Sequence, residues 1–430
     1  MNDYVSIITV NYNGKKYLED FLSSLKNLNY PKDSFEVIVV DNASTDNSIS
    51  YIKENFPLVR VIASNKNLGF GKGNNLGIIN AKGNLCLLVN NDTVLEKDSL
   101  INIVDTYKRW SEKEKVGAVN AKLVLADSYL PLFLREAFFS DYVIPDNAMA
   151  INKNPFVITH EKGNNYLEKI FIPINDKYKD DLIINLTIRP FRGNLFEIFL
   201  EEEKIYEGVI KKIGKEKEIK LSISKEELIK YRTNLIQNAG NFYFRDGYGR
   251  DRGAVVFNHK QFYEKDMGQY DKEEVIPGFC GAGVLLNKEA LNEVGYFDED
   301  FFMYYEDADL SVRLFEYNWK IVYSPKSIIR HIHAGTSEEW SNFFVFNVER
   351  GRLLFVAKHW PRLSVFYELI KYVIKDTIIV SIYYIVRVNK KIGLEKFIIR
   401  FRVFVSIIIP SLLGLLRTKR LTSAKLKTFL

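Results

Sequence analysis

The sequence predicts an α/β protein that carries an inserted antiparallel β-sandwich and ends in a basic, amphipathic helical tail. Apolar strands alternate with helices in residues 1–125 and again in 237–355. Short strands without helices fill residues 150–235, and residues 362–430 are both basic and apolar. A length of 430 residues, with 47% hydrophobic residues, is enough for more than one folded domain and excludes a disordered chain.

Continuous apolar strands dominate residues 1–125. We expect strands at 4–10, 35–40, 59–64 and 85–89, joined by helices at 15–28, 48–55 and 73–81. Strands of this kind predict a parallel sheet covered on both faces, and ligands of such sheets lie beyond the carboxyl ends of the strands. Those ends carry Asn11, Asp41, residues 64–67 and residues 90–92.

The middle of the chain has a different pattern. We expect short alternating strands at 169–174, 182–189, 195–200, 204–210 and 218–223. Without helices between them, they predict a small antiparallel sandwich inserted into the α/β domain. The sandwich could serve as a spacer or lid, or as a module that binds carbohydrate or a partner.

The α/β pattern resumes near residue 237. A small-residue loop leads into a strand at 277–286, an aromatic and acidic segment covers 296–305, and a long amphipathic helix follows Trp340. We also expect helices at 289–294 and 306–317, and strands at 320–323 and 327–333.

The charge is concentrated at the end of the chain. Residues 362–430 hold fourteen Lys and Arg against three acidic residues, although the net charge of the whole chain is only +6. The uncharged runs 377–386 and 403–416 are shorter than the roughly 18–20 residues that span a bilayer. Flanking cations favour helices lying on an anionic membrane surface, and the other interpretation is a buried helical subdomain. Because the tail is apolar, we expect no nucleic-acid partner.

The N-terminal segment and the cysteine count bear on export and on redox chemistry. Residues 1–14 have no basic segment followed by a long apolar stretch, so we expect no cleaved signal peptide. Two cysteines, Cys86 and Cys280, exclude a disulfide scaffold and a thiolate zinc finger.

Two segments at the predicted ligand edge suit a nucleotide. Asp41 ends a buried strand and could accept the imide N–H of a pyrimidine, or it could cap a helix, although Ser44 and Asp46 are available for capping. The Gly-rich segment 67–75 lacks the Gly-Lys-Ser/Thr of a P-loop, but a diphosphate could rest on its amides and on Lys72. An ordinary loop is the competing interpretation.

A cation site is expected where the fourth strand ends. Asp92 suits a hard divalent cation that bridges two phosphates, and Asn90 and Asn91 precede it. One Asp holds a metal poorly, so His331 or His333 would supply a second ligand; on a strand, only one of them can point inward. A histidine pair of this kind is more often structural.

Three acidic residues begin the helix at residue 306. They favour the helix dipole, and Asp309 is placed for a surface ion pair with Arg313. Asp307 cannot share that face. Because an aromatic segment precedes it, a partly dry site would raise the pKa of Asp307 towards that of a useful base.

These segments stand in one order along the chain: Thr9-Val10-Asn11-Tyr12-Asn13, Asp41-Asn42 with Ser44-Thr45-Asp46, Asn67-Leu68-Gly69-Phe70, Asn90-Asn91-Asp92, Gly281-Ala282-Gly283, Phe297-Asp298 with Phe301-Phe302, Tyr305-Glu306-Asp307 with Asp309, and His331. The set resembles glycosyltransferase family 2, inverting enzymes of the GT-A fold, and within it the rhamnosyltransferase-like branch. The resemblance covers roughly residues 1–125 and 237–355.

The resemblance implies a role for each motif. The nucleotide would be held by Thr9, Asn11, Asp41, Asn42, Gly69, Lys72, Asn75 and Asn91. Mg²⁺ or Mn²⁺ would bind Asp92 and His331, with His333 as the alternative to His331. Asp307 would be the general base that deprotonates the acceptor hydroxyl, and the acceptor side would be shaped by Gly281, Ala282, Gly283 and Glu306.

Two features depart from the family pattern. Asn90 replaces the first acid of the usual Asp-x-Asp motif, as in rhamnosyltransferase-like members, and weakens the metal cage. The predicted sandwich lies outside the shared core.

We therefore expect transfer of a sugar from a nucleotide-diphospho-sugar, with dTDP-rhamnose favoured, to a glycan or polyprenyl-linked acceptor. The enzyme would lie peripherally on the cytoplasmic face of the cell membrane. The competing interpretations are a nucleotidyltransferase and a non-catalytic glycan-binding or scaffold protein. A nucleotidyltransferase would need an acidic metal pair and a Gly/Arg-Lys signature near residue 15, where only Gly14-Lys15-Lys16 stands. The sequence does not indicate an oligomeric state.

Overall fold

The computed structural model describes residues 3–150, 155–162, 165–190, 195–209, 215–257, 260–332, 341–415 and 421–429. It divides into two compact units. Unit 1 consists of Met1–Leu123, Asn238–Gly253 and Tyr270–Leu430, and unit 2 consists of Val124–Gln237 and Ala254–Gln269. The domain boundaries that we expected from sequence stay predictions.

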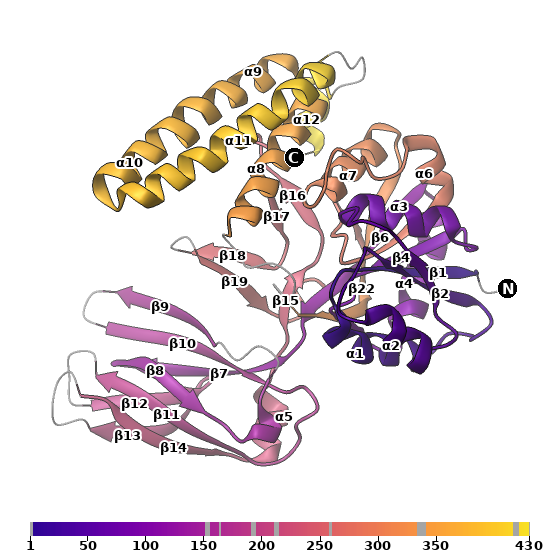
Figure 1. Cartoon of the computed structure of the whole chain (residues 1–430). Helices are drawn as coiled ribbons and strands as arrows, with labels where there is room; N and C mark the ends of the chain where they lie inside the picture. The colour runs from indigo at the N-terminus through magenta and orange to yellow at the C-terminus, as the bar shows by residue number, and fades with distance from the viewer. Residues whose placement is uncertain are drawn as a thin grey trace. The chain divides into compact units, whose positions relative to one another are not determined.

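Unit 1 is built on a mixed sheet (Figure 1). Its strands run in the order β6 (Val116–Leu125), β21 (Gly283–Asn287), β4 (Leu85–Val89), β1 (Val5–Asn11), β2 (Phe35–Asp41) and β3 (Arg60–Ala63). The four N-terminal strands pair in parallel, as predicted, but β21 is antiparallel to both β4 and β6. The sheet is therefore mixed rather than purely parallel.

Helices cover the two faces of this sheet. On one face, α1 (Lys15–Lys26) and α4 (Ser99–Ser111) pack on strand residues such as Ile7 and Val39. On the other face, α3 (Phe70–Asn80) lies so close that a Cβ at Gly77 would come within 2.4 Å of the Ile8 side chain. Two glycines of α3, Gly73 and Gly77, thus allow tight packing between helix and sheet. The shorter α2 (Ser48–Asn55) links β2 and β3.

The second α/β part completes unit 1. It contains the hairpin of β16 (Asn241–Tyr243) and β17 (Gly249–Asp251), then α6 (Lys288–Val294) and α7 (Glu306–Glu316). The two strands predicted at 320–323 and 327–333 form one strand, β22 (Lys320–His331), because it pairs with both β20 (Glu274–Val275) and β5 (Thr93–Leu95).

Unit 2 is an antiparallel sandwich. One sheet has the order β13-β12-β7-β10-β9 and the other β14-β11-β8. The strands are β7 (Ser128–Arg135), β8 (Ala137–Val143), β9 (Phe156–Lys162), β10 (Asn165–Ile174), β11 (Leu182–Pro190), β12 (Leu195–Leu200), β13 (Glu203–Val209) and β14 (Lys217–Ile223). Side chains from both sheets, including Leu132 and Leu186, share one core. The five predicted strands correspond to β10–β14, whereas β7, β8 and β9 were not predicted.

The end of unit 2 holds a short helix and a hairpin. The helix α5 (Lys225–Tyr231) begins at a capping box formed by Ser224 and Glu227. After it, β15 (Leu235–Asn238) and the hairpin of β18 (Ala254–Phe257) and β19 (Lys260–Lys265) follow.

The C-terminal tail of unit 1 is helical. It contains α8 (Asn342–His359), α9 (Arg362–Lys371), the π-helical η2 (Tyr372–Ile379), α10 (Val380–Arg387), α11 (Lys390–Leu415) and α12 (Ser423–Phe429). Phe429 stacks on Tyr243 with ring centroids 5.3 Å apart, so the tail shares a core with the second α/β part. Within the described residues, the structure contains no helix that combines the length and the apolar character needed to cross a bilayer.

Candidate active site

The carboxyl ends of β1 and β2 form a buried polar cluster. Their parallel register places Asn11 opposite Asp41, and Asn11 Nδ2 donates to Asp41 Oδ2 at 3.0 Å. Asn91 Nδ2 donates to Asn11 Oδ1 at 2.7 Å, and the Ser44 backbone N–H donates to Asp41 Oδ1 at 2.9 Å. Three residues predicted to bind the nucleotide, Asn11, Asp41 and Asn91, are thus brought together. Asp41 also stabilises the turn that follows it through its hydrogen bond with Ser44.

Two other predicted nucleotide residues carry unsatisfied buried atoms. Thr9 Oγ1 and Asn42 Oδ1 have no hydrogen-bond partner within the described residues. A buried polar atom without a partner costs free energy that an incoming ligand group can recover. The Asn42 amide is held in place because its Nδ2 donates to the Gly69 carbonyl at 3.0 Å.

Gly69 starts α3 in a conformation that requires glycine. Its φ is +77°, and a Cβ there would lie 2.2 Å from the Phe302 carbonyl oxygen. Asn75 is occupied elsewhere, because its side chain makes hydrogen bonds of 2.8 and 3.0 Å with the backbone of Phe297. Lys72 forms an exposed ion pair with Glu299. The Asn75 side chain therefore holds the 297 loop in place, and its predicted contact with the diphosphate stays a prediction.

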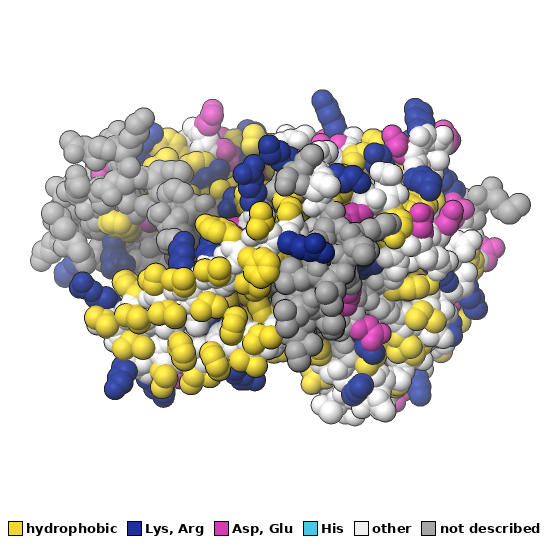
Figure 2. Space-filling view, turned by 90° about the horizontal axis from the view of Figure 1, so that it is seen from above, with side chains coloured by type: hydrophobic (Ala, Val, Ile, Leu, Met, Phe, Trp, Pro, Cys, Tyr) yellow, Lys and Arg dark blue, Asp and Glu magenta, His cyan; other side chains and the backbone are white. Residues whose placement is uncertain are grey.

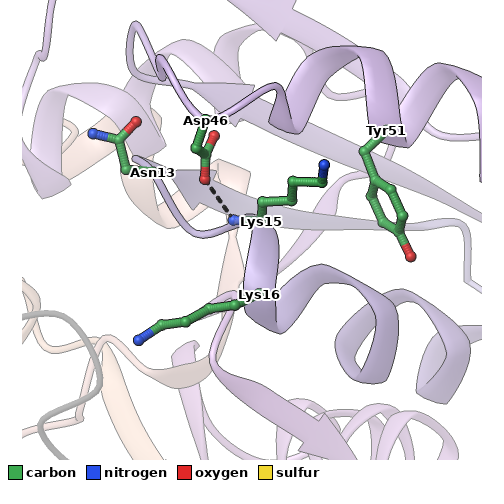
Figure 3. Close-up of a pocket in the computed structure, with 5 residues that line it drawn as sticks. All are labelled: Asn13, Lys15, Lys16, Asp46 and Tyr51. Carbon is green, nitrogen blue, oxygen red and sulfur yellow. Dashed lines mark hydrogen bonds between the residues drawn. The ribbon is translucent and has the colours of Figure 1, made fainter.

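A pocket of about 480 Å³ opens beside the β1–α1 turn (Figure 3). It is lined by Asn13, Lys15, Lys16, Asp46 and Tyr51. The Lys15 backbone N–H donates to Asp46 Oδ2 at 2.8 Å, which ties the turn after β1 to the turn after β2. The pocket adds two cations to the ligand edge. The sequence interpretation gave these two lysines no role in the transferase site.

Asp92 and His331, the two predicted metal ligands, lie next to each other. The pairing of β5 with β22 sets His331 opposite Thr93, and Asp92 Oδ1 lies 3.2 Å from His331 Nε2. Two adjacent ligands of an octahedral ion with bonds of about 2.1 Å would lie about 3 Å apart, close to this separation. Asp92 Oδ1 is buried, and apart from this contact with His331 it has no partner among the described residues.

The protein alone offers an incomplete metal cage. No cluster of three or more His, Cys, Asp or Glu suited to a metal exists within the part of the chain that the structure describes. Asn90 Nδ2 lies 3.5 Å from His331 Nε2, so this amide stands where an acid would complete the family motif. The remaining ligands would have to be phosphate oxygens or water. His333, the alternative ligand, lies outside the described residues.

Asp307 is a half-buried carboxylate at the start of α7. It accepts hydrogen bonds from the N–H groups of Ala308, at 2.8 Å, and Gly281, at 3.3 Å. Burial raises the pKa of Asp307 to about 6, although these two hydrogen bonds lower it. The nearby Asp251 carboxylate also raises the pKa of Asp307. Asp307 therefore has the pKa of a base that is deprotonated near neutral pH.

The residues around Asp307 fix its position. Tyr304 and Tyr305 have φ of +67° and +70°, an uncommon conformation for consecutive non-glycine residues and one that is typical of functional sites. Gly281 contributes its N–H to Asp307, and Ala282 and Gly283 continue from it into β21. Glu306 Oε2 is buried without a partner within the described residues, and burial together with Asp307 raises the pKa of Glu306.

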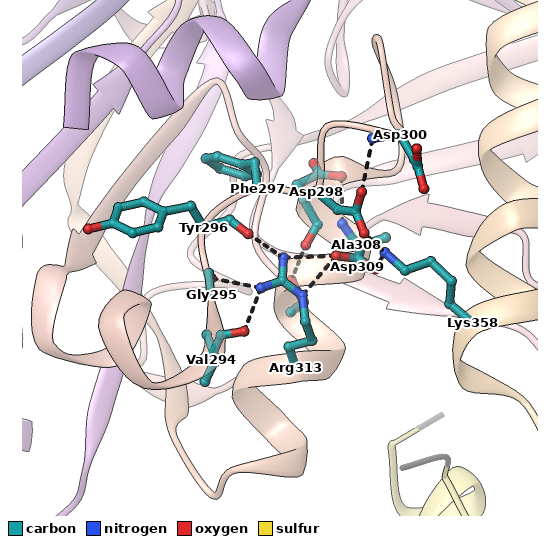
Figure 4. Close-up of polar contacts among 12 residues, drawn as sticks. Val294, Gly295, Tyr296, Phe297, Asp298, Asp300, Ala308, Asp309, Arg313 and Lys358 are labelled. Atoms are coloured by element: carbon teal, nitrogen blue, oxygen red, sulfur yellow. Dashed lines mark hydrogen bonds and ion pairs between the residues drawn. The ribbon is translucent and has the colours of Figure 1, made fainter. Parts of the chain in front are cut away.

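Asp309 corrects our sequence prediction. Its ion pair with Arg313, at 2.8 Å, is present, but the Asp309 side chain is fully buried rather than at the surface. Lys358 and His359 of α8 also contact it, at 2.5 and 2.9 Å (Figure 4 shows Arg313 and Lys358). Although burial acts in the other direction, Arg313, Lys358 and His359 hold the pKa of Asp309 well below its usual range. The prediction failed because it could not include α8.

Asp251 is a site residue that sequence reasoning missed. Burial raises its pKa to about 6, and its carboxylate accepts a hydrogen bond of 2.9 Å from Asn238 Nδ2. Asn238 Oδ1 in turn accepts from Asn120 Nδ2, and Asn120 Oδ1 accepts from the Cys280 N–H. This chain of amides joins Asp251 to the loop that holds Asp307. The only sequence signal was an acid between Arg250 and Arg252 in a Gly-rich stretch.

Comparison with known families agrees with this geometry. Residues 6–112 match the model of glycosyl transferase family 2, and residues 234–347 match that of glycosyl transferase family group 2. The first segment carries Asp41 and Asp92, and the second carries Asp307 and His331.

Three relatives illustrate the range of the similarity. A dolichyl N-acetyl-alpha-D-glucosaminyl phosphate 3-beta-D-2,3-diacetamido-2,3-dideoxy-beta-D-glucuronosyltransferase of Methanococcus voltae is 31% identical, over 33% of this chain and 51% of its own length. The poly(ribitol-phosphate) beta-N-acetylglucosaminyltransferase TarS of Staphylococcus aureus is 35% identical, over 22% of this chain and 17% of its own. An N-acetylglucosaminyl-diphospho-decaprenol L-rhamnosyltransferase of Mycobacterium tuberculosis is 39% identical, over 14% of this chain and 20% of its own.

The chain thus spans about half or less of the length of these relatives. Both family matches nevertheless fall on the α/β segments that carry the site. The chain therefore belongs to glycosyltransferase family 2 and has the GT-A fold.

Proposed function

We propose that this protein is an inverting glycosyltransferase that moves a sugar from a nucleotide-diphospho-sugar to a hydroxyl group of a glycan acceptor. The observation that carries the proposal is Asp307, a carboxylate with a pKa raised to about 6 that is held by backbone N–H groups at the start of α7. Such a group is deprotonated at neutral pH and remains basic enough to take a proton.

The residues act in a single displacement. Asp307 takes the proton of the acceptor hydroxyl, whose oxygen forms the new bond to the anomeric carbon. The bond between that carbon and the diphosphate oxygen breaks, and its electron pair leaves with the diphosphate. Attack opposite the leaving group inverts the anomeric centre. Asp41, Asn11 and Asn42 would bind the nucleoside, and the N-terminal turn of α3 after Gly69 would face the diphosphate.

A divalent cation fits the site beside the leaving group. Asp92 and His331 would hold Mg²⁺ or Mn²⁺, which would compensate the charge of the diphosphate. Because Asn90 cannot add a carboxylate, we propose that the donor diphosphate completes the coordination.

The donor and acceptor follow from the relatives only by analogy. Their names include transfer of N-acetylglucosamine, rhamnose and, in a Salmonella typhimurium protein, abequose. We propose dTDP-rhamnose as the first donor to test, because the motif set resembles the rhamnosyltransferase-like branch. For the acceptor we propose a lipid-linked or polysaccharide glycan, reached from the cytoplasmic face of a membrane by a peripherally bound enzyme.

Calorimetric titration with nucleotide sugars tests this proposal. dTDP-rhamnose, UDP-glucose, UDP-galactose, UDP-GlcNAc and GDP-mannose would each be titrated into wild type and Asp92→Asn, with Mn²⁺, Mg²⁺ or EDTA. Asp33→Asn serves as a control, because Asp33 is an exposed acid of the same unit. We expect one donor to bind, EDTA to weaken it, and Asp92→Asn to remove the effect of metal. Binding that ignores EDTA would refute the metal role, and no binding of any donor would count against the transferase.

A further inference from the structure

The geometry points to a lipid-binding surface on the C-terminal helices: we propose that the outer face of α9, η2, α10 and α11 docks onto an anionic membrane interface. This outer face consists of exposed apolar residues that recur every three or four positions. They are Leu363, Phe366, Tyr367, Ile370, Ile374, Ile378, Ile382, Tyr383 and Val386 in the first three elements, and Leu394, Phe397, Ile398, Phe401, Val405 and Ile408 in α11.

Exposure of this kind is unusual for a surface in water. Leu363 is 84% exposed, Val386 71% and Ile382 55%. Figure 2 shows hydrophobic side chains gathered in one broad patch, with Lys and Arg side chains at its edge. Contiguous apolar patches of this extent mark sites that contact another apolar medium.

The inner side of the same helices buries apolar residues such as Tyr372, Val403 and Ile407, together with a few polar ones. Glu368, Thr377 and Ser381 are buried there, and Thr377 Oγ1 and Ser381 Oγ have no hydrogen-bond partner within the described residues. A helix on a water-soluble domain places its apolar stripe inward and its polar residues outward. Here the outer side is apolar as well as the inner one, as expected where the outer face meets lipid rather than water.

The charges around the outer face favour anionic lipid as its partner. Lys375, Arg387, Lys390, Lys391 and Arg402 are exposed on these helices. Among the described residues 362–408, Glu395 is the one exposed acid, because Glu368 is buried and Asp376 half-buried. When an apolar face inserts into a membrane interface, each cation that flanks it attracts anionic headgroups. A second copy of the chain would instead bring two sets of like charges together.

The outer face is fixed relative to the catalytic helix α7. Lys358 and His359 of α8 bind Asp309, which lies two residues from Asp307. Val365 of α9 and Ala308 of α7 belong to the same hydrophobic cluster. Docking would therefore hold the start of α7 at a set orientation to the membrane. The inference rests on exposure and charge and does not depend on the proposed catalysis.

Vesicle flotation with the full-length chain tests the proposal. Wild type would be compared with Ile378→Glu/Ile382→Glu, and with Leu58→Glu/Ile79→Glu as a matched control on exposed apolar residues elsewhere in unit 1. Vesicles would contain phosphatidylcholine with about 30% phosphatidylglycerol, or phosphatidylcholine alone. We expect wild type and the control to float with the anionic vesicles and the first variant to bind about a hundredfold more weakly or worse.

A charge variant and a solution measurement complete the test. Lys390→Glu/Lys391→Glu should weaken binding to anionic vesicles about tenfold or more, with little change on phosphatidylcholine alone. Equal flotation of wild type and Ile378→Glu/Ile382→Glu would overturn the proposal. The proposal would also be overturned if wild type did not float and light scattering showed a dimer that Ile378→Glu/Ile382→Glu converts to monomer. The outer face would then bind a second copy of the chain. Donor binding by each variant confirms the fold separately.

Discussion

Replacing Asp309 by asparagine removes the negative charge at the centre of a fully buried cluster. Lys358 lies 2.5 Å from Asp309 and is itself almost fully buried, and Arg313 lies 2.8 Å away (Figure 4). Removing one partner of a buried ion pair costs about 3–5 kcal/mol, because the other charge stays buried without compensation.

The structure places the expected loss at the lower end of that range. Lys358 keeps an ion pair with Asp298, and the Arg313 guanidinium keeps hydrogen bonds to the carbonyls of residues 294–296. We therefore expect Asp309→Asn to lower the free energy of unfolding of unit 1 by about 3 kcal/mol. Glu299→Gln, which breaks the exposed pair with Lys72, should cost about 1 kcal/mol or less.

Tryptophan fluorescence during urea denaturation measures this loss in one unit. All four tryptophans lie outside the segments of unit 2, so their emission follows unit 1. Because the pKa of Asp309 is depressed in the folded state, its contribution is complete above the unfolded-state pKa of about 3.9 and declines as the pH falls below that value. Titration of Asp309 itself should thus leave the difference between wild type and variant unchanged from about pH 5 to 8. A loss no larger than that of Glu299→Gln would refute the reasoning.

Three further substitutions test packing that the sequence did not predict. Gly69→Ala should destabilise unit 1 by about 1–3 kcal/mol, because the added Cβ would lie 2.2 Å from the Phe302 carbonyl oxygen. Gly295→Ala is the comparison, because its φ is also positive, at +88°, but the nearest atom to its Cβ is 3.4 Å away. It should cost about 1 kcal/mol in the same urea titration. Phe429→Ala should cost about 3–5 kcal/mol, because Phe429 is buried against Tyr243 and Phe315. If Phe429→Ala unfolded at the wild-type midpoint, the tail would not belong to the core of unit 1.

Local periodicity predicted the N-terminal strands and helices well. Each of β1, β2, β3 and β4 lies within two residues of its expected range, because continuous apolar runs between turns are a local signal. In contrast, the sequence interpretation missed β6 and β7. Their strand pairing depends on partners far along the chain, and β6 is buried along its whole length.

The same limit applies to the candidate site. The sequence placed Asp92 and His331 each near the end of a strand, and the structure brings them to 3.2 Å. Asp309 was wrongly placed at the surface, because a spacing of four residues reports only contacts within its own helix. Asp251 carried no motif, and its importance depends on Asn238 and Asn120, which folding brings to it.

The central claim is that Asp307 is the general base, and the pH dependence of donor turnover tests it most directly. The rate of sugar release from the bound donor to water would be measured from about pH 4.5 to 8.5 for wild type, Asp307→Asn and Asp300→Asn, an exposed acid of the preceding loop. A base works when deprotonated, so the wild-type rate should rise about tenfold per pH unit up to about pH 6 and then level. Because Glu306 and Asp307 interact, the pH at which the rate levels reflects the titration of both carboxyl groups together.

We predict that Asp307→Asn lowers turnover by about 10²–10⁴-fold without loss of donor binding, and that Asp300→Asn leaves it unchanged. Turnover by Asp307→Asn within about threefold of wild type, with the same pH profile, would contradict the account.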